Sequence, residues 1–422
     1  MFGSDCGSQA DGNAMPLPEP TTLSAVVKIA ERCNINCSYC YVFNAGDETY
    51  RERPKIMGQD VIEATAQFLL DGCVSLGISN LLVILHGGEP LLMGKKEFDR
   101  MCTTFREVLT PDLNMYITMQ TNATLIDQDW LEIFARHHVR IGVSIDGPKQ
   151  YNDEFRVTFK GGGTYDAARR GIDLLLTAQE RNLIPDISAL CVINCQRSAD
   201  VIYNHIVHDL GIRKLDFLLP DFTHDTIGAQ DPRLYGKFLC NAFDAWIADK
   251  DPAIEVRILK SVLSTLLGGP RYVSVLGREA INVVTIQSDG TLAADDTLRA
   301  CGFEVMSEGD TIFDTTLQQF FTNDLMKRLS SDYQEKAQAC QSCGWLNICG
   351  GGSLINRFKK ENRFSNASVY CDGLRQFFSH VSQFLLTQGF GFSDISAALQ
   401  DKVDHTAPWT REEVVSRPGV RK

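Results

Sequence analysis

The sequence predicts an α/β fold built on a parallel sheet, and two patterns along the chain predict it. Short β-branched runs alternate with longer amphipathic segments about six times between residues 24 and 220. This is the order of elements in a parallel sheet whose strands are buried and whose crossovers are right-handed. Six strand–helix units are too few to close a barrel of eight. A partial barrel or an open sheet is therefore expected.

The expected strands are short and rich in Val, Ile and Leu, and the expected helices carry apolar residues three and four positions apart. The strands are 24–30, 80–86, 115–120, 139–145, 187–193 and 214–220. The helices between them are 60–70, 96–109, 128–138, 165–180 and 199–210.

This regularity stops near residue 220. Two helical stretches follow, 234–250 and 257–269. The segment 283–294 then has the pattern of a β-hairpin, with Asp289 and Gly290 as its turn pair.

Residues 300–385 are rich in cysteine, glycine and aromatic residues and show little periodicity, as expected where metal ligation replaces a large core. The polar residues after 385 are expected to form a loosely held tail. The expected divisions are a disordered leader (1–22), a core (23–245), bridging helices and a hairpin (246–299), a cysteine-rich domain (300–386) and the tail (387–422).

Composition excludes several classes of function. The chain of 422 residues carries a net charge of −12, which argues against binding to nucleic acid or to an anionic membrane surface. No run approaches the roughly 18 apolar residues of a membrane span. The first residues lack the basic and apolar regions of a secretory signal, so a cytoplasmic location is expected.

Fourteen cysteines in a reducing compartment favour metal ligation over disulfides. Cys33, Cys37 and Cys40 form a C-x3-C-x2-C motif directly after the first expected strand. A structural zinc site or an electron-transfer cluster is closed by four protein ligands. Three thiolates in one loop leave one iron of a cluster open to bind something else. A redox-sensing or zinc-binding thiol cluster is the alternative.

This motif and its position resemble the hallmark of the radical S-adenosylmethionine (radical SAM) superfamily. The resemblance implies a partial (β/α)6 barrel in which SAM chelates the open iron of a [4Fe–4S] cluster. It further implies reductive cleavage of SAM to a 5′-deoxyadenosyl radical that removes a hydrogen atom from substrate, work that belongs to the cofactor.

Further motifs at strand ends extend the resemblance, because α/β folds assemble ligand sites there. "HGGEPLL" follows the second strand and "SIDGP" follows the fourth. The resemblance implies that Glu89 binds the SAM amino group, Ser144 the ribose and Arg156 the SAM carboxylate, with Tyr39 beside the adenine. The implied SAM-binding residues are Tyr39, Gly87, Gly88, Glu89, Ser144 and Arg156.

A second cysteine group has the spacing C-x2-C-x5-C followed by a distant fourth cysteine. Four thiolates suit either zinc or an iron–sulfur cluster, and spacing alone does not decide between them. The tract resembles the SPASM extension of radical SAM enzymes that modify peptides, and this implies one auxiliary [4Fe–4S] cluster. Its implied ligands are Cys340, Cys343, Cys349 and Cys371.

Many SPASM proteins carry a second auxiliary cluster, and here the expected ligand positions are changed. Ala294 and Asp295 stand where a cysteine would follow the hairpin, and Ser353 stands four residues after the third cysteine of the group. One auxiliary cluster is therefore expected, with Cys301 unligated. A second cluster that recruits Cys301 and non-cysteine ligands is the alternative.

The tracts "CGGG" and "ENRFSNASVYC" and the "DTL" context of Asp296 resemble a SPASM branch that closes three-residue cyclophanes in ribosomally synthesised peptides. The resemblance implies an oxidoreductase that links an aromatic ring to a side-chain β-carbon of a precursor peptide, a step in RiPP maturation. Such a crosslink expels a ring proton, so a carboxylate is chemically apt, and Asp296 is the expected catalytic base.

Other functions stay open at this stage. Anaerobic sulfatase maturation, which forms formylglycine, is the first alternative, followed by thioether formation or epimerisation on a peptide. A non-catalytic zinc scaffold is the alternative from another class. The expected partners are the precursor peptide and an electron donor such as flavodoxin or ferredoxin, with no nucleic acid and no membrane.

Overall fold

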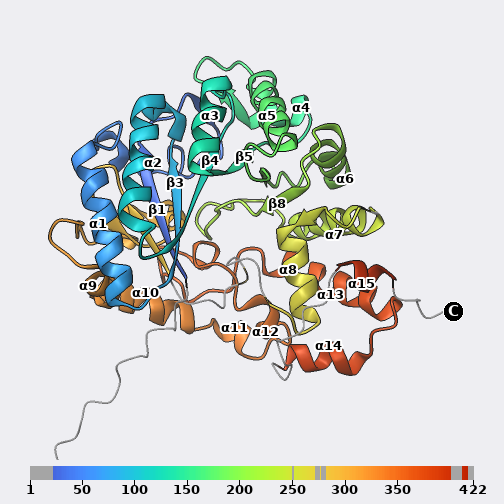
Figure 1. The fold of residues 1–422 in the computed structure, drawn as a ribbon. Helices are drawn as coiled ribbons and strands as arrows, with labels where there is room; N and C mark the ends of the chain where they lie inside the picture. The colour runs from blue at the N-terminus through green and yellow to red at the C-terminus, as the bar shows by residue number, and fades with distance from the viewer. Residues whose placement is uncertain (1–21, 250, 271–275, 277–281, 401–410, 417–422) are drawn as a thin grey trace, which may run out of the picture.

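The computed structural model describes residues 22–249, 251–270, 276, 282–400 and 411–416 (Figure 1). The expected leader lies outside the described residues except for Thr22, and Cys6 lies outside them as well.

A nine-stranded sheet organises the described chain, in the order β11-β10-β1-β3-β4-β5-β7-β8-β9. Its six central strands are all parallel, as the sequence predicts. They are β1 (Thr22–Ala30), β3 (Asn80–Gly87), β4 (Asn114–Thr121), β5 (Arg140–Ser144), β7 (Ser188–Val192) and β8 (Lys214–Leu218). The expected α/β partial barrel is therefore confirmed.

The crossover helices pack on the outer face of the sheet, where they form the left and upper parts of Figure 1. The two faces of the sheet differ in their side chains, because successive residues of a strand point to opposite faces. On β1, Ala25 and Val27 are fully buried in the core, whereas Ser24 and Val26 line a cavity on the inner face. The helices are α1 (Gln59–Ser75), α2 (Lys95–Leu109), α3 (Gln128–His137), α4 (Lys149–Phe155), α5 (Tyr165–Glu180) and α6 (Ala199–Asn204), which continues as a π-helical turn (His205–Asp209).

The expected hairpin forms and joins the barrel sheet. Strand β10 (Val283–Ile286) pairs in parallel with β1, and β11 (Leu292–Ala293) pairs antiparallel with β10. Gly290 has a φ of 86°, a conformation that favours glycine in the turn. The strand at the other edge, β9 (Glu255–Val256), pairs in parallel with β8. The sequence predicted the hairpin but not its place beside β1.

The chain after β11 lies below the sheet in Figure 1. It is mostly short helices, but α13 is 17 residues long, so the prediction of little periodicity fails there. The expected loose tail also fails in part, because Ile395 and Ala398 of α14 are buried and α14 packs against α8 and α12. Its helices are α9 (Leu317–Thr322), α10 (Asp324–Gln334), α11 (Gln338–Gln341), α12 (Leu346–Cys349), α13 (Cys371–Thr387), α14 (Phe392–Leu399) and α15 (Arg411–Ser416). Two further helices, α7 (Pro232–Ala248) and α8 (Arg257–Leu266), precede the hairpin.

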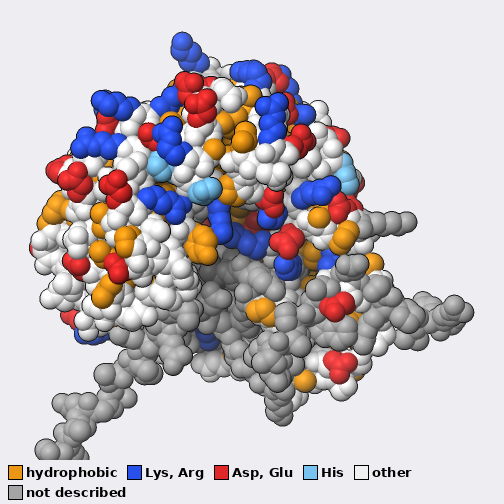
Figure 2. Space-filling view, in the orientation of Figure 1, with side chains coloured by type: hydrophobic (Ala, Val, Ile, Leu, Met, Phe, Trp, Pro, Cys, Tyr) orange, Lys and Arg blue, Asp and Glu red, His pale blue; other side chains and the backbone are white. Residues whose placement is uncertain are grey.

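In the described part of the chain, no helix combines the length and apolarity that a membrane span requires. On the face that Figure 2 shows, basic and acidic side chains are interspersed over the helices that cover the sheet.

Helices α7 and α13 touch backbone to backbone where two glycines meet. A Cβ built on Gly236 would lie 2.3 Å from the carbonyl oxygen of Gly373. A Cβ on Gly373 would lie 2.3 Å from the carbonyl oxygen of Pro232. Because α13 begins at Cys371, this contact fixes the fourth cysteine of the second group against the barrel.

Replacing Gly236 by alanine should force the two helices apart. Overpacking of this kind costs about 1–3 kcal/mol, which should appear as a lower midpoint in denaturant unfolding of the anaerobic protein. Asn241→Ala, on the exposed side of α7, is the matched control and should stay near the wild-type midpoint. A wild-type midpoint for Gly236→Ala would show that the helices do not pack this closely.

Candidate active site

A cavity of about 840 Å³ lies between the inner face of the sheet and the segment that follows the hairpin. Strand residues such as Ile84, Gln120 and Leu218 form one wall. Ala294, Asp295, Thr297, Leu298 and residues 353–356 contribute to the other. The carboxyl ends of the parallel strands therefore open into one enclosed space, as in other α/β folds.

The three cysteines of the first motif all line this cavity. Their loop includes β2 (Ile35–Cys37), which pairs antiparallel with β6 (Arg156–Thr158), and the register places Cys37 opposite Arg156. A further hydrogen bond runs from the backbone N–H of Ser38 to the carbonyl of Phe155 at 3.0 Å.

Burial makes these thiols costly to ionise without a cation. It raises the pKa of Cys33 to about 12 and that of Cys37 to about 11, although Arg156 opposes the shift at Cys37. A bound metal stabilises thiolate and reverses this preference. The donor set, three soft thiols around one cavity wall, fits an iron–sulfur cluster with one open iron.

Gly87 and Gly88 allow two backbone segments to touch. A Cβ on Gly87 would lie 2.1 Å from the carbonyl oxygen of Ala30, and one on Gly88 would lie 2.2 Å from that of Arg32. The Gly88 N–H donates to the Ala30 carbonyl at 2.7 Å, and the Glu89 N–H donates to the Arg32 carbonyl at 2.9 Å. The glycines thus seat the start of the thiol loop against the end of β3, besides lining the cavity.

Glu89 is buried in the cavity wall. It accepts hydrogen bonds from the Thr121 hydroxyl at 2.7 Å and from the backbone N–H groups of Asn122 at 2.8 Å and Leu91 at 3.2 Å. Burial raises the pKa of Glu89, and these donors oppose the rise. The carboxylate is thereby oriented for a cationic group such as an ammonium.

Arg156, Tyr39 and Asp146 form a polar chain beside the thiols. The guanidinium of Arg156 donates to the Tyr39 hydroxyl at 2.8 Å, and that hydroxyl donates to Asp146 at 2.5 Å. The hydroxyl of Ser144, the last residue of β5, accepts a hydrogen bond from the side-chain amide of Gln120 at 2.8 Å. The six expected SAM-binding residues therefore all line this cavity together with the thiols.

A smaller cavity of about 90 Å³ is lined by all four cysteines of the second group. Burial raises the pKa of Cys349 to about 12. Four thiols around one small space fit a fully ligated cluster. Among the described residues, no three His, Cys, Asp or Glu side chains are arranged to hold a single metal ion.

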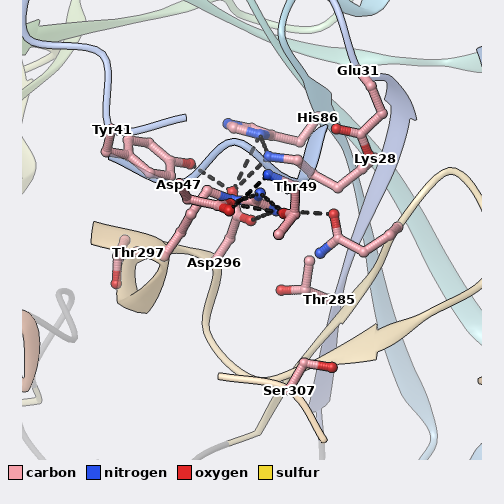
Figure 3. A network of polar contacts seen from close by, with 12 residues as sticks. Lys28, Glu31, Tyr41, Asp47, Thr49, His86, Thr285, Asp296, Thr297 and Ser307 are labelled. Carbon is pink, nitrogen blue, oxygen red and sulfur yellow. Dashed lines mark hydrogen bonds and ion pairs between the residues drawn. The ribbon is translucent and has the colours of Figure 1, made fainter. Parts of the chain in front are cut away.

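Asp296 lies in a buried network of ion pairs that joins the segment after β11 to β1 (Figure 3). Its carboxylate accepts from the Lys28 ammonium at 2.7 Å and the Tyr41 hydroxyl at 2.8 Å, and Arg299 lies 3.5 Å away. Burial opposes ionisation, but Lys28 and Arg299 hold the pKa of Asp296 well below its usual range. His86 completes the network, and burial together with Lys28 lowers its pKa to about 4.

Several residues of this site were not predicted from sequence. Asp146 stands inside the quoted "SIDGP" motif, and its burial could not be read from the motif. The sequence could have indicated that Lys28 is paired, because a lone cation in the buried run "SAVVKIA" needs an anion. The partner, 268 positions away, could not be deduced.

Replacing Lys28 by methionine should destabilise the protein by about 3–5 kcal/mol near pH 8, because Asp296 would lose its main cation while buried. Without Lys28, burial favours the neutral form of Asp296, so the carboxyl group of the variant takes up a proton as the pH falls and no longer leaves a buried unpaired charge. The deficit in denaturant unfolding should therefore shrink toward pH 4. Lys95→Met, which removes two ion pairs at the surface, should cost about 1 kcal/mol or less. A deficit of the same size at both pH values would contradict the assigned network.

The fold and the thiol-lined cavity define a class of α/β proteins that bind an iron–sulfur cluster at one end of a partial barrel. The family model described as "Radical SAM superfamily" matches residues 27–187. An uncharacterized protein of Archaeoglobus fulgidus is 30% identical over 371 residues, which cover 83% of this chain and 78% of that protein. The chain belongs to the radical SAM superfamily, and it is an enzyme that uses SAM with a [4Fe–4S] cluster.

Two curated relatives have assigned activities. A cysteine-type anaerobic sulfatase-maturating enzyme of Clostridium perfringens is 27% identical and aligns over 85% of this chain and 96% of its own length. A serine-type sulfatase-maturating enzyme of Bacteroides thetaiotaomicron is 25% identical, with 84% and 87% covered.

Two solved structures share the fold. The structure of anSMEcpe with bound AdoMet and the Cp18Cys peptide has a TM-score of 0.74 and 23% identity, and the match covers 90% of this chain and all of that one. Streptococcus suis SuiB bound to S-adenosylmethionine has a TM-score of 0.55 and 16% identity, with 83% and 75% covered.

Proposed function

We propose that this enzyme crosslinks an aromatic ring to a side-chain β-carbon within a ribosomally synthesised precursor peptide. The observation that carries the proposal is the composition of the cavity wall opposite the sheet. Ala294, Asp295 and Ser353 line the cavity there, at positions where cysteines would ligate a second auxiliary cluster. Space that a cluster would fill is left for substrate.

Each bound group has a matching set of residues. Cys33, Cys37 and Cys40 would hold the cluster that binds SAM. Glu89 would bind the amino group of SAM, and Arg156 its carboxylate. When bound, cluster and SAM supply the abstraction of a hydrogen atom from the peptide. The chain itself orients the peptide and excludes water from the enclosed cavity.

The second group, Cys340, Cys343, Cys349 and Cys371, would hold one auxiliary [4Fe–4S] cluster. With all four positions filled by thiolates, this cluster would accept or pass an electron and would not bind substrate. Cys301 is buried in the apolar core and is not among the residues that line the cavity, which supports its assignment as unligated. The electrons that reduce the clusters would come from a donor such as flavodoxin or ferredoxin.

The second candidate is anaerobic sulfatase maturation. It is favoured by the curated relatives, which align with most of this chain under that name. Both reactions remove two hydrogen atoms from a peptide, but a crosslink joins two residues and formylglycine formation alters one.

Anaerobic co-expression with the peptide encoded by the short open reading frame nearest the gene tests the proposal. The product should lose two hydrogens per crosslink, and tandem mass spectrometry should show no cleavage between the joined residues. A sulfatase peptide converted to formylglycine, with the neighbouring peptide unchanged, would replace crosslinking by the second candidate.

Reconstituted protein should contain about eight irons per chain, four for each of two clusters. The variant with alanine at Cys340 and Cys343 should keep about four and retain the cluster that binds SAM. Chemical iron analysis with Mössbauer spectroscopy measures both. About twelve irons in the wild type would mean that Asp295 and Ser353 do not mark a lost site.

A further inference from the structure

One carboxylate in the cavity wall has no partner in the described part of the chain. Asp221 follows Pro220 just after β8 and lines the cavity. Among the residues that the structure describes, none forms a hydrogen bond or an ion pair with its side chain. Asp221 is half-buried, so its carboxylate can be reached from the cavity that it lines. A carboxylate left unpaired here therefore points to a partner that arrives with the substrate.

The backbone around Asp221 is held on both sides. The Tyr370 hydroxyl donates to the Pro220 carbonyl at 2.8 Å. The Asn356 amide donates to the Phe222 carbonyl at 3.0 Å and to the Pro220 carbonyl at 3.4 Å. Three tethers from the cysteine-rich segment thus fix the position of a side chain whose own oxygens remain unbonded. That combination is typical of a preorganised functional group.

The charges around Asp221 suit proton transfer. Burial, and then the negative charges of Asp295 and Asp296, raise the pKa of Asp221 to about 7. A general base works best with a pKa near the working pH. The titratable groups that interact with Asp221 are Tyr41, Asp295, Asp296, Cys301 and Tyr370.

The neighbouring acids are less suited to this role. Asp296 is not among the residues that line the cavity, and its carboxylate is already bound by Lys28 and Tyr41. Asp295 lines the cavity, but one of its oxygens accepts from the backbone N–H of Thr297 at 3.0 Å and from the Thr297 hydroxyl at 2.9 Å.

We propose that Asp221, and not Asp296, is the catalytic base that accepts the proton expelled from the substrate when the crosslink closes. This inference rests on the proposed function. After the β-carbon radical adds to the aromatic ring, the new carbon–carbon bond leaves one ring carbon with an extra hydrogen. That hydrogen leaves as a proton to the Asp221 carboxylate. One electron leaves to an acceptor of the iron–sulfur class, and the ring regains its aromaticity.

The activity test compares Asp221→Asn with the wild-type holoenzyme on the peptide encoded beside the gene. Hydrogen abstraction needs no base, so 5′-deoxyadenosine should form within about twofold of wild type. Crosslinked peptide should fall about 100-fold or more, the usual contribution of a general base. Asp221→Glu should recover part of the activity. Asp112→Asn removes an exposed carboxylate and should leave both products unchanged.

The pH profile separates a base from a merely structural residue. In the wild type the rate of crosslinking should rise with pH and level off above about 7, because only the ionised carboxylate accepts a proton. In Asp221→Asn the residual rate should lose this rise.

A stability measurement tests the environment of Asp221 without substrate. Because the pKa of Asp221 is raised in the folded state, the wild type loses stability as the pH rises from about 4 through 7. Asp221→Asn should therefore unfold at a higher temperature than wild type at pH 8, with the difference vanishing toward pH 4. Asp296→Asn should show the opposite sign at pH 8, because the pKa of Asp296 is depressed.

The outcomes separate the two proposals. Wild-type crosslinking by Asp221→Asn would overturn the assignment of the base and leave the proposed function standing. Absence of crosslinked product from the wild type would overturn the proposed function itself. An Asp221→Asn variant no more stable than wild type at pH 8 would show that the carboxylate is paired in solution, which also overturns the inference.

Discussion

The whole site depends on one close contact between two backbone segments. The end of β3 can lie against the start of the thiol loop only because Gly87 and Gly88 have no side chains to fill the space that the Ala30 and Arg32 carbonyls occupy. That contact sets the height of the loop above the sheet, so that its three cysteines face the cavity. It also places Glu89, the next residue, where two donors from the end of β4 and one from the turn after Glu89 converge on its carboxylate.

A second constraint joins the two halves of the chain. Lys28 is fully buried on β1, and its anion, Asp296, comes from the segment that follows the hairpin. Removing either charge leaves the other buried and unpaired, so the pair holds that segment in one place against the barrel. The parallel pairing of β10 with β1 acts in the same direction. Together these contacts close the cavity that the open edge of a partial barrel would otherwise leave exposed.

The aspartates in and beside the cavity show how different surroundings give identical side chains different pKa values and different roles. Asp296 is surrounded by cations and stays ionised, which suits it to hold structure. Asp221 has no cationic partner among the residues that the structure describes and interacts with other carboxylates, which suits it to take up a proton. The pKa of Asp221 is therefore raised and the pKa of Asp296 is lowered, although both are aspartates whose charges interact. A residue chosen as a base from a resemblance in sequence can thus be the less basic of two neighbouring carboxylates.

The sequence by itself determined the parallel sheet, its six central strands and the two cysteine groups, because each depends on a local period or spacing that a short stretch displays. The six residues that it assigned to one binding site all line the same cavity. Only the tertiary structure decided that Lys28 pairs with Asp296, that α13 packs on α7 through two glycines, and that Asp221 stands unpaired in the cavity. These features depend on which distant segments come into contact and on whether a charged side chain then has a partner. A short stretch of sequence does not contain that information.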